Sequence, residues 1–74
     1  MGQNLSSLVH ILLTGGPDAL EAADRRRRIP AGESEVKVRR AHCTEHFRRT
    51  PVTVRIHQRE FQVYDWSHRT YVAE

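Results

Sequence analysis

The run of residues 25–30 divides this sequence into two halves with different hydrophobic patterns. The run reads Arg-Arg-Arg-Arg-Ile-Pro, with aliphatic residues and alanines before it. Every Phe, Tyr and Trp and the only cysteine lie after it. Because proline cannot continue a helix and the hydrophobic period changes here, we expect a helical half before Pro30 and a strand half after it.

Residues 4–28 have the spacing of two short helices. Apolar residues at positions 5, 8, 9, 12 and 13 follow the i, i+3, i+4 spacing of one helical face. Asn4 is a suitable N-cap, and Pro17 suits the first turn of a second helix after Gly15 and Gly16. Acidic residues early in this second segment and arginines late in it would complement a helix dipole. The sequence therefore predicts a helical hairpin over residues 4–28.

Residues 34–73 alternate as strands do. Val36 and Val38 alternate with charged residues, and residues 52–57 and 61–66 repeat the pattern with a change of parity between them. That change requires a turn, so we expect these two segments to pair as a hairpin. The prediction is a single α+β domain over residues 1–74, in which the helical hairpin and a linker at 29–33 precede an antiparallel sheet of three to four strands.

Arginine dominates the charge of the chain. The net charge is +3 with neutral histidines, and Lys37 is the only lysine among 12 basic residues. GC-rich coding would explain this, and so would selection for the guanidinium group, which binds phosphate or carboxylate in bidentate fashion. A basic balance favours nucleic acid, anionic lipid or an acidic protein surface as partner.

We therefore expect a non-enzymatic small basic protein that binds nucleic acid through an arginine-rich surface. No recognised nucleic-acid motif is present, so the binding would be electrostatic. The run 25–28 is expected to contribute less, because Glu21 and Asp24 offset part of its charge within the helix. Alternatively, each arginine cluster is only a solvated polar face. The predicted contact residues are Arg39, Arg40, Arg48, Arg49, Arg55, Arg59 and Trp66.

The N-terminus supports a different function. Residues 1–6 fit the M-G-x-x-x-[ST] acylation pattern, so Gly2 is a candidate for myristoylation and residues 25–28 for the polybasic second signal. This hexapeptide resembles the start of several myristoylated viral proteins, which would imply a viral peripheral membrane accessory protein. A third alternative is a small subunit or inhibitor that docks on another protein through the apolar N-terminal helix. Self-association would also suit so small a core.

The cysteine and histidines give little support for a metal or for catalysis. His42, Cys43 and His46 are weak metal candidates, because a zinc site needs four ligands and no second half follows at ligand spacing. A Cys–His catalytic pair would lack an orienting third group. We therefore predict no cofactor. The single cysteine, the lack of a signal peptide and the lack of a membrane-spanning run favour an intracellular, cytoplasmic protein. Separately, we expect an accessory protein of viral or phage type.

Overall fold

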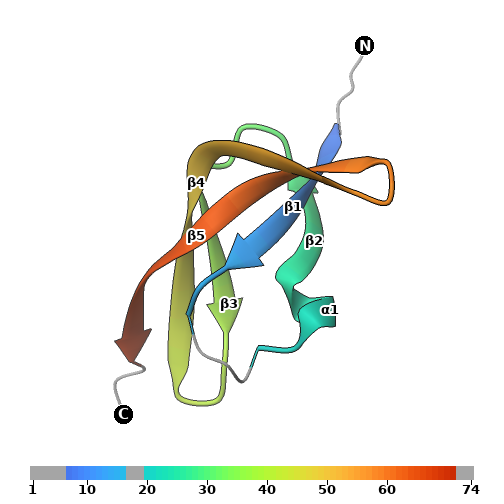
Figure 1. Ribbon diagram of the computed structural model, residues 1–74. Helices are drawn as coiled ribbons and strands as arrows, with labels where there is room; N and C mark the ends of the chain where they lie inside the picture. The colour runs from blue at the N-terminus through green and yellow to red at the C-terminus, as the bar shows by residue number, and fades with distance from the viewer. Residues whose placement is uncertain (1–6, 17–19, 72–74) are drawn as a thin grey trace.

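The computed structural model describes residues 7–16 and 20–71, and most of this part is β-strand (Figure 1). All five strands join in one mixed sheet, in the order β2-β1-β5-β4-β3. β1 and β5 are parallel, and the other neighbouring pairs are antiparallel. In chain order the elements are β1 (Leu8–Thr14), α1 (Ala22–Arg25), β2 (Arg26–Pro30), β3 (Glu35–Arg39), β4 (Cys43–Ile56) and β5 (Arg59–Tyr71).

The predicted helical hairpin, and with it the α+β fold, is wrong. The apolar run of residues 8–13 is strand β1, which lies between β2 and β5 and has apolar residues on both faces. Such a run is interrupted only by His10, so it satisfies helical spacing and strand alternation equally well. Its seven residues are too few for a stable isolated helix, and pairing on both sides satisfies the backbone instead. Asn4 and Pro17 lie outside the described residues.

The arginine run is also a strand and not the end of a helix. The only helix among the described residues is the four-residue α1, and β2 begins directly after it at Arg26. The predicted linker at 29–33 therefore starts inside β2. The apolar N-terminal helix proposed to dock on another protein is likewise absent, since its residues pair within the sheet.

The strands predicted around Val36 and within residues 52–66 are present, and β4 is longer than expected because it begins at Cys43. Val54 pairs with Phe61 and Ile56 with Arg59, so even positions of β4 face odd positions of β5. The two turn residues, His57 and Gln58, both have positive φ (51° and 66°), as a two-residue hairpin turn requires even without Asn-Gly. This turn explains the change of parity.

One face of the sheet carries the main core. Ile11 and Leu13 point to this face with Tyr64 of β5, and Leu20 packs on it from the segment that follows β1. The Tyr64 hydroxyl donates a hydrogen bond to the carbonyl of Glu33 at 2.5 Å, which ties β5 to the loop before β3. The buried cluster consists of Ile11, Leu13, Leu20, Val36, Val38, Phe47 and Tyr64. We call this side the core face and the other side the outer face.

Candidate functional site

The outer face carries a hollow surrounded by arginines, which we call the arginine hollow. Its volume is about 440 Å³. Its lining residues come from α1, β1, β2 and the start of β5, and β2, β1 and β5 are neighbours in the sheet (Figure 1). None of the described residues that line it is acidic. They are His10, Ala23, Arg26, Arg27, Arg28, Arg59 and Phe61.

Strand register explains why these residues meet. Arg28 pairs with His10 across the β1–β2 ladder, and paired residues share a face of the sheet. Arg26 lies two residues away on the same face, by alternation along β2. Phe61 of β5 contacts the His10 ring edge-on, with ring centroids 5.7 Å apart. The hollow is therefore assembled from three adjacent strands, of which β5 is far from β1 and β2 in the sequence.

The electrostatics of the hollow are cationic. Partial burial of the ring, followed by the charges of Arg59 and Arg28, holds the pKa of His10 below its ordinary value of 6.5. Both guanidinium groups therefore act on the same ring. An anion placed beside the ring would meet the positive charges of Arg28 and Arg59.

The neighbouring arginines make contacts that hold β2 in place. Arg25 donates hydrogen bonds to the carbonyls of Leu13 and Gly15 at 3.2 and 2.8 Å, at the end of β1. The Nε of Arg27 donates to the carbonyl of Asp24 at 3.0 Å. Arg26 and Arg28 are exposed between these contacts, so their side chains face solvent at the rim of the hollow.

The seven predicted nucleic-acid contacts do not form one surface. Arg59 alone among them lines the arginine hollow. Arg55 lies opposite Glu60 in the β4–β5 ladder, on the core-face side of the hairpin. Arg48 lies opposite Glu35 in the β3–β4 ladder, on the outer face. Arg49 lines a separate hollow of about 410 Å³ beside Tyr64, and Arg39 ends the edge strand β3.

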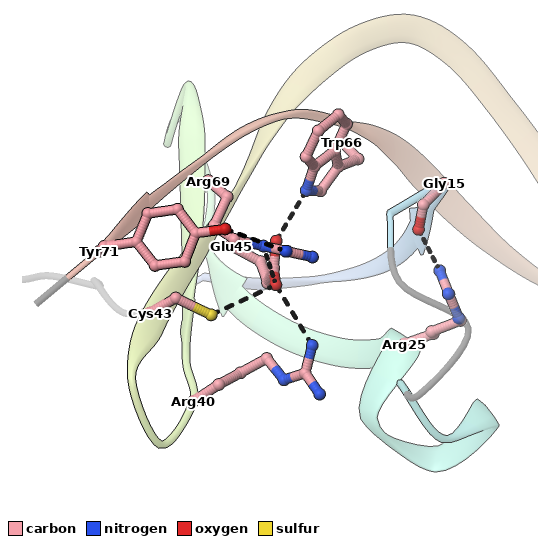
Figure 2. A network of polar contacts seen from close by, with 8 residues as sticks. All are labelled: Gly15, Arg25, Arg40, Cys43, Glu45, Trp66, Arg69 and Tyr71. Carbon is pink, nitrogen blue, oxygen red and sulfur yellow. Dashed lines mark hydrogen bonds and ion pairs between the residues drawn. The ribbon is translucent and has the colours of Figure 1, made fainter.

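Arg40 and Trp66 belong instead to a buried ionic cluster around Glu45 (Figure 2). The Glu45 side chain is fully buried, and its Oε2 accepts hydrogen bonds from Arg40 at 3.2 Å and Arg69 at 2.9 Å. Its Oε1 accepts from the indole N–H of Trp66 at 2.9 Å, and the Cys43 thiol lies 3.6 Å from Oε2. Both oxygens of the carboxylate therefore accept from donors on β4, on β5 and in the turn between β3 and β4.

The cluster keeps Glu45 ionised. Burial raises the pKa of this carboxyl, but the hydrogen bonds from Trp66 and Arg40, together with the charge of Arg69, outweigh burial and lower the pKa below 4.5. The donors already satisfy the carboxylate. We therefore regard the cluster as structural.

The three predicted metal candidates do not meet. Cys43 points to the Glu45 cluster on the core face, whereas His46, three residues on, points to the outer face. His42 is exposed in the turn before β4. The sheet instead brings His46 against His68 of β5 and Glu35 of β3.

His10 is a site residue that was not predicted from the sequence, and Arg26 and Arg28 belong to the run 25–28 that was expected to contribute less. One signal was available: His10 interrupts an otherwise apolar run, and the arginine run ends in Ile29-Pro30, a pattern compatible with an edge strand. No local pattern indicates that β2 pairs with β1, so the meeting of Arg28 with His10 was not predictable from spacing.

Comparison with known proteins gives one match. A family model described as a family of unknown function, DUF5988, matches residues 6–74. No curated protein and no solved structure matches significantly. Within the described part of the chain, no helix has the length and apolar character needed to cross a membrane.

Proposed function

The chain belongs to DUF5988, a family of unknown function, and from the geometry of its arginine hollow we propose that it is a non-enzymatic nucleic-acid-binding protein. The observation that carries the proposal is the convergence of Arg26, Arg28 and Arg59 around His10 and Phe61 on one face of the sheet. Guanidinium groups on a shared face are what a phosphate backbone requires, because each replaces condensed counterions.

The floor of the hollow supports the same function. The ring of His10 is partly exposed beside the guanidinium groups, with the buried Phe61 packed against it, and base–aromatic stacking is the sequence-tolerant contact of single-strand binders. An acidic protein surface would also be attracted by the arginines, but it does not need an aromatic floor. We therefore place nucleic acid first, and single strands ahead of duplex.

The first test removes the two exposed arginines of β2. The double variant Arg26→Ala, Arg28→Ala should bind single-stranded oligonucleotides at least about tenfold more weakly at low salt than the unmodified chain does. The slope of log K against log salt should fall by about 0.7 per lost phosphate contact on single strands, or about 0.9 on duplex. Fluorescence anisotropy titrations at several salt concentrations measure both quantities.

A matched control is the double variant Arg39→Ala, Arg55→Ala, which changes the net charge equally at exposed positions outside the hollow. If both double variants lose the same affinity, binding follows net charge and not the hollow. If the unmodified chain binds neither RNA nor DNA at low salt, but binds an acidic peptide, the arginines recognise a protein.

The pKa of His10 provides an independent test of binding at the arginine hollow. An anion in the hollow would offset the charges of Arg28 and Arg59, so the pKa of His10 should rise on binding. By linkage, the affinity for the oligonucleotide should increase as the pH falls from above the bound pKa of His10 to below its free pKa. The substitution His10→Gln should remove this pH dependence. Two-dimensional NMR of the histidine rings, with and without oligonucleotide, measures the shift. An unchanged His10 titration in a saturated complex would place the nucleic acid elsewhere.

A further inference from the structure

A second cluster of polar side chains lies on the outer face, away from the arginine hollow. Glu35 of β3, His46 of β4 and His68 of β5 come from three adjacent strands, and one ligand-type atom from each lies within 4.8 Å of the other two. We call these residues the histidine cluster. We propose that they form a binding site for a divalent transition-metal ion, with Zn²⁺ as the best match.

The donor types suit this metal. Two imidazoles and one carboxylate are a common three-ligand set for Zn²⁺, with water as the fourth ligand. Harder ions such as Mg²⁺ and Ca²⁺ prefer sites made of oxygen atoms, so two histidines discriminate against them.

Each histidine has one ring nitrogen already held by a hydroxyl group. His46 Nε2 lies 2.9 Å from Thr70 Oγ1, and His68 Nδ1 lies 2.8 Å from Ser67 Oγ. Metal-binding histidines show this pattern, because the outer partner fixes the tautomer and the orientation of the ring. It leaves His46 Nδ1 and His68 Nε2 as the ligand atoms. Nδ1 of His46 faces Glu35 Oε2 at 2.8 Å, in the position where a metal would replace the shared proton.

To close on an ion, the ligand atoms must move closer together and one imidazole ring must turn out of the stack. Bonds of 2.0–2.1 Å at a tetrahedral angle place ligand atoms about 3.3 Å apart. His46 is buried and is the fixed ligand, whereas His68 is exposed and Glu35 is about one-third exposed. The two imidazole rings are stacked, with centroids 4.2 Å apart and planes at 8°, so rotation of the exposed His68 ring is the main change required.

Lys37 and Arg48 are the charged neighbours that oppose a cation. Lys37 pairs with His46 across the β3–β4 ladder, and its charge acts on Glu35. Arg48 lies opposite Glu35 in the same ladder. The affinity must therefore come from coordination and not from a negative field.

The test is a titration of the untagged, chelator-stripped full chain with Co²⁺ and Zn²⁺. We expect one ion per chain by calorimetry and visible Co²⁺ absorption typical of a tetrahedral site. No thiolate-to-cobalt band should appear, because Cys43 points to the opposite face. His68→Gln should weaken binding at least about tenfold, and Glu35→Gln should do so to a similar extent. Both substitutions are at accessible side chains, so circular dichroism should confirm that the variants fold.

His42→Gln is the matched control, because it removes an exposed histidine next to β4 but outside the cluster. Binding that is lost in His68→Gln and retained in His42→Gln supports the proposal. Binding that survives in both His68→Gln and Glu35→Gln overturns it, as does a folded unmodified chain that takes up neither ion. None of these variants alters the arginine hollow, so the outcome is separate from that of the oligonucleotide titrations.

Discussion

The substitution Glu45→Gln should destabilise the protein by about 3 kcal/mol. Removing one partner from a buried ion pair typically costs about 3–5 kcal/mol, because the opposite charge is left without compensation. Arg40 and Arg69 are each about one-third exposed and can turn partly to water, so we expect the lower end of that range.

That loss is large for a chain of this size. A domain of 74 residues has a total stability of roughly 4–11 kcal/mol at the usual value per residue. The carboxylate also accepts a hydrogen bond from the indole N–H of Trp66. The side-chain amide introduced by Glu45→Gln would therefore place its own N–H donor against the donors of Arg40, Trp66 and Arg69. Urea unfolding followed by Trp fluorescence measures the change.

The pH dependence of stability provides a second measure of the same cluster. The folded pKa of Glu45 is lowered, so the stability it contributes is present above its ordinary value of 4.5 and is lost as the pH falls through the folded value. Glu45→Gln should therefore lose less stability on acidification than the unmodified chain does. Glu60→Gln, at an exposed carboxylate beside the hairpin turn, is the matched control. If the two substitutions change the loss of stability on acidification equally, the cluster around Glu45 does not account for the acid sensitivity of the fold.

The second large effect is expected at Ile11. Ile11→Ala should cost about 2–5 kcal/mol, because the side chain is fully buried in the core cluster and its removal leaves a cavity. Leu8→Ala should cost well under 1 kcal/mol, since Leu8 is 50% exposed at the start of β1.

This pair of substitutions distinguishes a strand from a helix. On a helix, Leu8 would lie on the apolar stripe and Ile11 would lie outside it. In β1, alternation places Ile11 and Leu13 on the core face and Leu8 on the outer face. Thermal or urea melts of the two variants give the answer. A larger loss for Leu8→Ala than for Ile11→Ala would contradict the sheet described above.

The C-terminal half of the fold could be predicted because its strands are half-buried. Alternation around Val36 and within residues 52–66 indicates strands with one face toward the core and one face toward water. The hairpin pairs residues that are close in the sequence, so its two strands could be matched from the sequence. The N-terminal half could not be predicted in this way. The run 8–13 is apolar at nearly every position, so its period is ambiguous, and its pairing partners are distant in the sequence.

For the candidate sites too, some properties follow from the sequence and others only from the fold. Composition alone gives an arginine-rich, basic chain, and that determines the class of partner we propose. Which arginines act together depends on strand register, which places Arg28 opposite His10 and brings Arg59 to the same hollow. The pairing of His46 with His68 has the same origin. A sequence determines the chemistry of each side chain and its local period, whereas neighbours across a sheet are determined only when the whole chain has folded, because register is a non-local property.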